Sequence, residues 1–213
     1  MLMAMAVIAF SSCQEHDEDV IDYSLKNGNI FCADGRIVPQ DAYDPNSMNG
    51  IGVIVKTGGE DDGYKAIAVG KEDIGSHFYC DSLMSVPGVS SETGLMNGKE
   101  NTAALINLHN EENIAVPAAE AASAYRTAGV SGWHLPSCGE LLEASKGGSM
   151  IEKALELIGG HPMTEEWYMS STQDGASENT KILYMYCVSM KEGRVRYAMK
   201  SESYPVRPFI TIK

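Results

Sequence analysis

The most informative segment of this chain reads Gly132-Trp133-His134-Leu135-Pro136-Ser137-Cys138-Gly139-Glu140-Leu141. Ser137 is followed three residues later by Glu140, the spacing at which a serine caps a helix start and a glutamate reaches back to the cap. Pro136 and Ser137 therefore predict where a helix begins. We expect Trp133 to bury its ring beneath that helix, because a large aromatic side chain contributes most to a core. His134 is predicted to be on the surface.

Further helix signals lie on both sides of this segment. Ser149 and Glu152 form a second predicted capping box, and the pairs Gly147-Gly148 and Gly159-Gly160 are predicted to end the two helices. Upstream, we expect a short helix at 102–109 and a stronger one at 117–128. Pro117 suits its first position and Gly129 suits its C-terminal cap.

The two ends of the chain have a β pattern. In the N-terminal part, three segments rich in apolar residues predict strands at 29–32, 51–55 and 64–69. The glycine-rich and acidic connector 58–63 suits a hairpin turn, and 70–98 shows little periodicity and reads mostly as loop.

The C-terminal third returns to this β pattern. Strands are predicted at 167–171, 181–190, 194–199 and 204–212, with a turn at 191–193. Pro205 and Pro208 favour an edge position for the last strand. The order of β, α and β segments predicts one α+β domain over residues 28–213.

Four segments together resemble the lectin-like modules called DUF1566 or the Lcl C-terminal domain, which are common in Bacteroidetes surface proteins. The segment at 132–141 resembles their Gly-Trp-x-Leu-Pro-Ser-x-x-Glu-Leu signature. The other three are Asn97-Gly98-Lys99-Glu100-Asn101-Thr102, Trp167-Tyr168-Met169-Ser170-Ser171-Thr172 and Val206-Arg207-Pro208. The resemblance covers about 28–213 and is strongest from 97 onward. It implies a C-type-lectin-like fold, with a twisted antiparallel sheet, two or three flanking helices and long loops. It also implies scaffold roles for the motif residues, with 170–172 pairing to a neighbouring strand.

The N-terminus resembles that of a bacterial lipoprotein. Residues 1–12 are uncharged and mostly apolar, with 2–10 of the right length for a secretion signal. Phe10-Ser11-Ser12-Cys13 resembles a lipobox, although Phe stands where Leu is usual. No Lys or Arg precedes the apolar stretch, which a translation start upstream of Met1 would explain. The resemblance implies that Cys13 is acylated and becomes the mature N-terminus.

An acidic cluster follows Cys13 directly. Gln14-Glu15-His16-Asp17-Glu18-Asp19 resembles the signal that sends Bacteroidetes lipoproteins to the cell surface. Such a cluster favours a solvated, extended chain. We therefore expect 13–27 to be an acidic tether, with the protein anchored at the outer membrane by its lipid and exposed at the cell surface.

Composition restricts the partners. The 213 residues carry a formal net charge of −13, which opposes binding to nucleic acid. The same charge opposes binding to an anionic lipid surface, so attachment to a membrane would depend on the lipid or on a partner. Beyond the N-terminus, no run of 18 apolar residues suggests a span.

Motifs for catalysis or metal binding are weak throughout the sequence. Cys32, Cys80, Cys138 and Cys187 contain no Cys-x-x-Cys pair. An exported protein can form disulfides among such residues, and a buried free thiol at Cys187 is an equal alternative. The loop residues Asp174, Glu178 and Asn179 offer oxygen atoms for a ligand, but their spacing is not that of a calcium loop. A solvated turn explains these three residues equally well. No cofactor or metal is predicted.

The sequence suggests three functions, in order of preference. The first is a non-enzymatic surface lipoprotein that binds or adheres to a glycan or another surface protein. The second is a structural or accessory subunit of a surface fibre. The third is an oxidase related to sulfatase-modifying factors, whose cysteine pattern this chain does not match. Ten tyrosines, several of them near the C-terminal strands, suggest a platform for stacking sugars, although tyrosines alternating along strands are more often part of the sheet packing.

Overall fold

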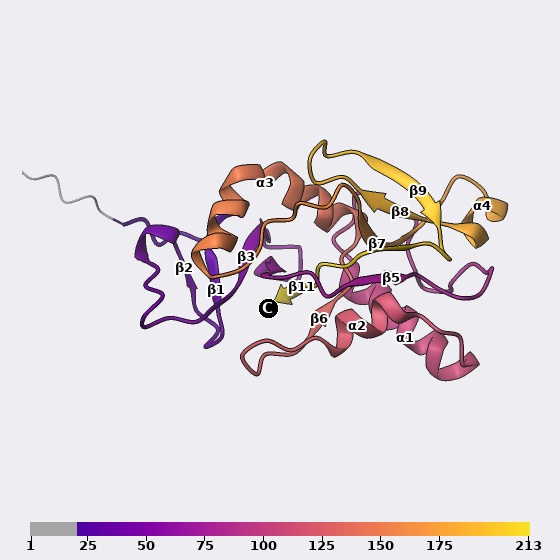
Figure 1. Cartoon of the computed structure of the whole chain (residues 1–213), viewed down its shortest axis with the longest axis horizontal. Helices are drawn as coiled ribbons and strands as arrows, with labels where there is room; N and C mark the ends of the chain where they lie inside the picture. Colours follow the sequence, from indigo (N-terminus) through magenta and orange to yellow (C-terminus); the bar gives the residue numbers. More distant parts are fainter. Residues whose placement is uncertain (1–20) are drawn as a thin grey trace, which may run out of the picture.

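A computed structural model describes residues 21–213, which form three antiparallel sheets and four α-helices (Figure 1). The predicted signal segment, Cys13 and the acidic cluster lie outside the described residues. The α-helices are α1 (Gly98–Glu112), α2 (Pro117–Ala124), α3 (Cys138–Leu157) and α4 (Glu178–Leu183), and a short 3-10 helix, η1, spans Gln40–Ala42. The strands are β1 (Ile30–Cys32), β2 (Ile37–Val38), β3 (Gly50–Thr57), β4 (Ala66–Gly70), β5 (Ser76–Phe78), β6 (Trp133–His134), β7 (Tyr168–Gln173), β8 (Tyr184–Val188), β9 (Val195–Met199), β10 (Ser203–Pro205) and β11 (Phe209–Ile212). Every strand pair is antiparallel, so the predicted α+β class is confirmed.

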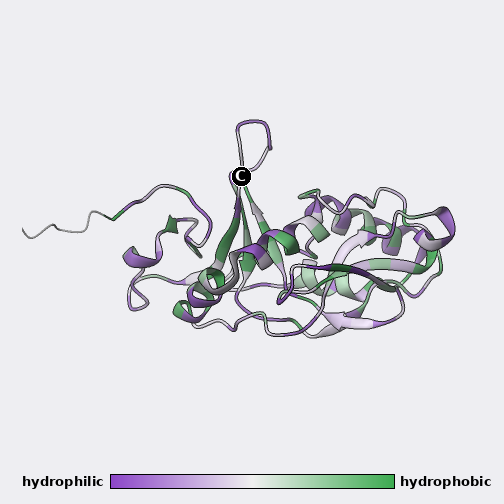
Figure 2. Cartoon of the chain, turned by 90° about the horizontal axis from the view of Figure 1, so that it is seen from above, coloured by the Kyte–Doolittle hydropathy of each residue, from purple (hydrophilic) through white to green (hydrophobic). Residues whose placement is uncertain are grey.

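The largest sheet has the order β2-β1-β3-β4-β11-β6 and separates two hydrophobic clusters. Val53, Ile67 and Phe209 point from one face toward α3, whereas Ile54 and Ala68 point from the other face. Alternation along the strands produces this division, because successive side chains of a strand face opposite ways. Figure 2 shows hydrophobic residues concentrated along these strands.

A second unit of the core lies around the three-stranded sheet β7-β8-β9. The strand β7 contacts both α1 and α3, which places it between the two helices. Met169, Met185 and Cys187 from this sheet pack with Leu105 of α1 and Ala119 of α2. The predicted hairpin turn at 191–193 is confirmed, since β8 and β9 pair on either side of it.

The helix α3 begins as its sequence predicts. The Ser137 hydroxyl accepts the Glu140 N–H at 3.2 Å, while a Glu140 carboxylate oxygen accepts the Ser137 N–H at 3.0 Å. Gly148 breaks the helix with φ 44° and ψ −129°, a conformation suited to glycine, and Gly159 with φ 69° follows its end. The second predicted capping box is wrong, because the backbone passes through the kink here and the Ser149 side chain makes no hydrogen bond within the described chain.

Several predicted boundaries are wrong because packing overrides local preference. The helix α2 ends at Ala124, and Gly129 instead lies in a turn closed by a Val130 N–H to Thr127 O bond of 2.9 Å. The predicted strand at 181–190 begins with the last three residues of α4, which is capped by Ser177. The predicted strand at 204–212 is two strands in different sheets, and β11 is internal, lying between β4 and β6.

Trp133 is buried with 2% of its surface exposed, as predicted, but on the face of the large sheet opposite α3. The prediction that it lies beneath the following helix is therefore wrong. Its indole ring lies edge-on to Tyr125, with 5.3 Å between ring centroids, and its N–H donates to Val130 O at 3.2 Å. The turn between α2 and β6 thus covers this side of the sheet.

Candidate functional site

Three of the four motif segments, 97–102, 132–141 and 167–172, meet in one buried polar network, which centres on Glu140. This carboxylate is fully buried and accepts the Gly98 N–H at 3.1 Å and the Ser137 N–H at 3.0 Å. His134 Nε2 lies 3.1 Å from the same carboxylate. A Cβ on Gly98 would lie 2.4 Å from Glu140 Oε2, so a side chain at this position is incompatible with the close approach of α1. The network therefore joins the starts of α1 and α3.

His134 is buried with 1% exposure, so the prediction that it lies on the surface is wrong. Its backbone pairs with Phe209 of β11, which places the ring inside the junction of α1 and α3. Its Nδ1 has no hydrogen-bond partner, the one such buried side-chain nitrogen or oxygen atom within residues 21–213.

The buried side chains of β7 continue the network toward α1. Asn101 donates to Ser171 Oγ at 3.2 Å, and Thr172 Oγ1 accepts the Cys138 N–H at 3.0 Å. The Ser171 N–H donates to Pro136 O at 2.7 Å. Because these bonds satisfy buried groups, Ser171 and Thr172 hold the segments together, as the resemblance implied. The predicted pairing of 170–172 with a neighbouring strand is wrong, because the β7–β8 register shifts between Met169 and Gln173. Within this irregular stretch the Ser170 hydroxyl donates to Tyr186 O of β8 at 2.7 Å.

A buried lysine and a buried arginine complete the scaffold. Lys200 Nζ donates to Met84 O, Lys181 O and Gln173 Oε1 at 2.8, 2.9 and 3.2 Å. Burial lowers the pKa of Lys200 to about 8. Arg207, also fully buried, donates to Asp73 Oδ1 and to the Gly70 and His161 carbonyls. Both cations are therefore occupied by contacts within the chain.

All four described cysteines are buried free thiols: Cys32, Cys80, Cys138 and Cys187. These four residues therefore form no disulfide with one another. Burial raises the pKa of each thiol, to about 12 for Cys138. A thiol that resists ionisation is a poor nucleophile, which favours packing roles for these residues.

The three predicted ligand residues lie around the start of α4 but are not equivalent. Asp174 is 4% exposed and its Oδ1 accepts the Tyr186 hydroxyl at 2.7 Å. Burial opposes ionisation of this carboxyl, but hydrogen bonds from the Thr180 and Tyr186 hydroxyls outweigh it and lower its pKa. Glu178 and Asn179 are exposed at the first turn of α4. The carboxylate of Asp174 thus contributes to the loop itself, and the other two side chains face solvent.

A cluster of exposed aromatic residues lies next to this loop. Tyr197 of β9 is 65% exposed and meets Tyr184 of β8 edge-on, with 5.1 Å between ring centroids. Met199, two residues along β9 from Tyr197, is 40% exposed. We call these three residues the tyrosine face. Sequence reasoning pointed to tyrosines in this region, but only the strand register shows which of them share a face.

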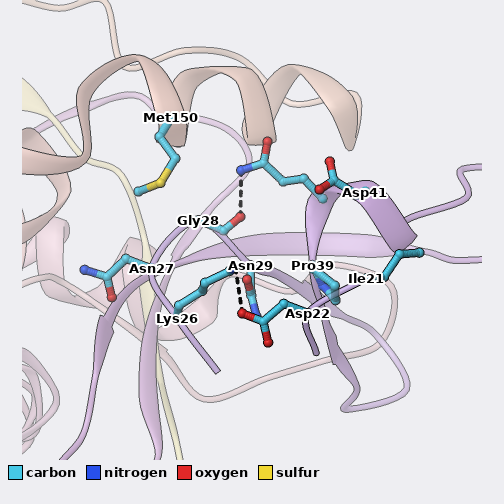
Figure 3. Close-up of a pocket in the computed structure, with 10 residues that line it drawn as sticks. Ile21, Asp22, Lys26, Asn27, Gly28, Asn29, Pro39, Asp41 and Met150 are labelled. Atoms are coloured by element: carbon cyan, nitrogen blue, oxygen red, sulfur yellow. Dashed lines mark hydrogen bonds and ion pairs between the residues drawn. The ribbon is translucent and has the colours of Figure 1, made fainter. Parts of the chain in front are cut away.

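An open groove of about 700 Å³ lies beside the N-terminal segment of the described chain (Figure 3). Its walls are the N-terminal segment 21–29, the turn at 39–41 and Met150 of α3. Gln40 Nε2 donates to Gly28 O at 3.0 Å, and Lys26 pairs with Asp22 at 3.3 Å. Two of the polar pairs in the groove are therefore already bonded to each other.

Neither a metal cluster nor a membrane span occurs in the described part of the chain. No three His, Cys, Asp or Glu side chains among residues 21–213 are grouped to hold a metal ion. None of the helices in this range is both long and apolar enough to cross a bilayer.

Comparison with protein-family models finds no match, and comparison with curated proteins finds none either. Among solved structures, the chain is similar to a fimbrial protein from Bacteroides ovatus, with a TM-score of 0.61 and 14% identity. The similarity covers 87% of this chain and 48% of that protein, so this chain spans about half the length of the structure it matches. At this identity the similarity shows a shared fold.

Proposed function

We propose that this chain is a non-enzymatic subunit or accessory protein of a surface fibre. The observation that carries the proposal is the shared fold with a fimbrial protein over 87% of the chain. Of the functions that the sequence suggested, the fibre role was the second, and the structural similarity now favours it over the first. The sequence resemblance to Bacteroidetes surface modules points to the same group of bacteria.

The chemistry of the buried polar residues supports a role without catalysis. The buried charged residues Glu140, Lys200 and Arg207 each form hydrogen bonds within the chain, so their charged groups are not directed at a substrate. The cysteine thiols are buried and resist ionisation. These residues act as scaffold in the proposal, which agrees with the C-type-lectin-like resemblance of the four motif segments.

Anchoring and export form the second part of the proposal. Cys13 and the acidic residues that follow it support lipid attachment at the outer membrane, with the domain exposed at the cell surface. A fibre subunit in that location would be exposed together with its assembly surfaces.

The test is recovery of the chain in sheared surface fibres. A short epitope inserted in the exposed 58–63 hairpin, away from the tyrosine face, allows immunogold labelling of intact cells. We expect labelled fibres and co-purification of the chain with the sheared, high-mass fraction. Recovery of the chain only from the membrane fraction, with no labelled fibres, would contradict the proposal. A variant with Cys13→Ser controls for surface attachment.

A second candidate function is glycan binding, and the tyrosine face is the observation that favours it. The exposed Tyr197 and the half-buried Tyr184 offer rings for stacking on a sugar, and Glu178 and Asn179 are exposed on the helix that directly precedes Tyr184. A glycan array with the unacylated chain tests this, using Tyr197→Ala as the variant and Leu83→Ala, an exposed residue in the 81–97 loop, as the control. A triple alanine variant at Asp174, Glu178 and Asn179 then tests the polar part. Full binding by the folded triple variant would place a glycan site elsewhere.

A further inference from the structure

The strand β9 forms an open edge of the three-stranded sheet. In the described chain the order is β7-β8-β9, and no strand lies beyond β9. Arg194 O accepts the Ser189 N–H and the Lys200 N–H donates to Leu183 O, each at 2.9 Å, which sets the hydrogen-bonded pairs of the β8–β9 ladder. Such pairs alternate along an antiparallel ladder, so Val195, Tyr197 and Met199 direct their backbone groups outward. Tyr197 N–H and O therefore face solvent.

The side chains of this edge are unusually apolar for an unpaired strand. Edge strands are generally protected by charges, proline or bulges, because an exposed apolar edge pairs with other strands. β9 contains no proline, and its one charged residue, Arg196, points to the other face and stacks on Trp167 at 4.2 Å. The outward face consists of Val195 and the exposed Tyr197 and Met199. This edge thus has the features of a surface that accepts a strand.

We propose that the β9 edge binds residues 21–24 of a second copy of this chain as an added antiparallel strand. The inference deepens the proposed function and rests on it for its biological role. The segment reads Ile21-Asp22-Tyr23-Ser24, in which apolar and polar residues alternate. Ile21 is 39% exposed and Tyr23 is 66% exposed, and residues 21–24 belong to no helix or strand of their own copy. Its side-chain contacts are local, apart from the Ser24 carbonyl, which accepts the Asn29 side-chain amide at 2.9 Å, so Ile21 and Tyr23 remain exposed for pairing with another copy.

One antiparallel register satisfies both faces of the added strand. It places Ile21 beside Tyr197, Tyr23 beside Val195 and Asp22 beside Arg196. Apolar side chains then extend the tyrosine face, while the carboxylate lies beside the guanidinium on the other face. Cross-strand pairs of these types stabilise sheets. Pairing β9 with a second β9 is less favourable, because that arrangement brings two Arg196 side chains close together on one face.

The two halves of this contact lie at opposite ends of the molecule. The N-terminal part of the described chain enters at the end that carries β1 and β2, whereas β9 and α4 lie at the far end of the long axis (Figure 1). One copy therefore cannot satisfy its own edge. A contact between two different surfaces of identical chains is head-to-tail and repeats without closing when its rotation does not form a ring. The proposed pairing produces a linear assembly of the kind that a fibre requires.

Analytical ultracentrifugation of the full chain with Cys13→Ala, which prevents acylation, measures the association. We expect concentration-dependent oligomers that weaken on the order of tenfold or more with Tyr197→Asp or with Asp22→Arg, since each removes a central contact. Leu83→Asp is the matched control, because Leu83 is 63% exposed and lies in the 81–97 loop outside the contact. Asp22 lies in an exposed segment whose hydrogen bonds are local, so Asp22→Arg leaves folding intact.

A charge exchange tests the register. Arg196→Asp alone weakens association, and Arg196→Asp combined with Asp22→Arg in the same chain restores it. A synthetic peptide of residues 17–25 competes with association, whereas a scrambled peptide does not. A strictly monomeric chain would overturn the inference. So would association that Tyr197→Asp abolishes and Asp22→Arg leaves unchanged, because β9 would then bind something other than this segment.

The outcomes also separate this inference from the proposed function. Recovery of the chain in fibres without self-association keeps the function and overturns the strand contact. Self-association through this register by a chain that is absent from fibres supports the contact and contradicts the function.

Discussion

Trp133 illustrates how single residues determine the packing of the large sheet. Its ring lies over two glycines, where a Cβ on Gly70 would be 3.1 Å from Cζ3 and a Cβ on Gly52 would be 3.6 Å from Cη2. The glycines therefore leave the space that the indole fills. The ring is too deeply buried to stack on a ligand, which assigns it to the core.

We expect Trp133→Ala to lower the free energy of unfolding by about 3–5 kcal/mol, because the substitution leaves a cavity the size of an indole ring. Thermal unfolding measures the change. Tyr197→Ala is the control, since Tyr197 is 65% exposed. A melting temperature for Trp133→Ala close to that of the unmodified chain would contradict the assignment of this ring to the core.

Lys200 predicts a pH dependence of stability. Burial lowers its pKa in the folded chain to about 8. Between this value and the unfolded value of about 10.4, the unfolded chain binds more protons, so this group raises the free energy of unfolding by up to about 1.4 kcal/mol per pH unit. Below about pH 8 the group is protonated in both states, and its contribution no longer changes.

Urea unfolding at several pH values, in the unmodified chain and in Lys200→Met, measures this contribution. The comparison between the two chains is necessary, because burial raises the pKa of the four described thiols and these titrate in the opposite direction. We expect the stability of the unmodified chain to rise relative to that of Lys200→Met above about pH 8. A constant difference between the two chains would show that Lys200 is not desolvated.

At the scale of elements, α3 shows that identical sequence signals have different outcomes. Both Ser137 and Ser149 precede a glutamate by three residues, yet only Ser137 forms the box. Ser137 also donates its hydroxyl to Leu95 O at 2.6 Å, which ties the helix start to the 81–97 loop. The kink at Gly148 removes the geometry that Ser149 would need.

Ser137→Ala should therefore destabilise the chain by about 0.5–2 kcal/mol or more, the usual cost of a lost cap. Ser149→Ala should change stability by no more than about 0.5 kcal/mol, as surface substitutions do. Chemical denaturation of the two variants compares them directly. Equal destabilisation by both substitutions would indicate that the second cap does form in solution.

At the scale of the whole molecule, the predicted lipid anchor at Cys13 and the described domain occupy successive parts of the chain. The domain described here begins where the acidic residues end, and residues 21–24 are exposed. A lipid on Cys13 would hold the chain at the membrane while the tyrosine face lies at the far end of the long axis. The predicted location and the proposed assembly surface are thus compatible.

Metabolic labelling with a palmitate analogue tests the anchor, and we expect the unmodified chain to be labelled and Cys13→Ser not to be. Replacing Glu15, Asp17, Glu18 and Asp19 with alanine should leave acylation intact but protect the domain from external protease. Equal labelling of the two chains would exclude acylation at Cys13. Unchanged protease access would show that the acidic residues do not direct export.

Local chemistry alone was sufficient to predict much of this protein. The start of α3 at Ser137, its glycine-bounded segments and the hairpin turns at 58–63 and 191–193 follow from caps and turns that act over a few residues. The same is true of the α+β class, which follows from the order of these elements. The exposure of Glu178 and Asn179 also agrees with their sequence context.

Contacts between distant residues determined the rest. The place of β11 between β4 and β6, the pairing of His134 with Phe209 and the bond from Gly98 to Glu140 each join segments that lie far apart in the sequence. The exposed edge of β9 likewise depends on which strands lie beside it. Caps and turns depend on interactions among a few neighbouring residues. The neighbours of a strand and the burial of a side chain depend instead on segments that are distant in the sequence. The hydrophobic periodicity of a strand does not show which distant segment will lie beside it.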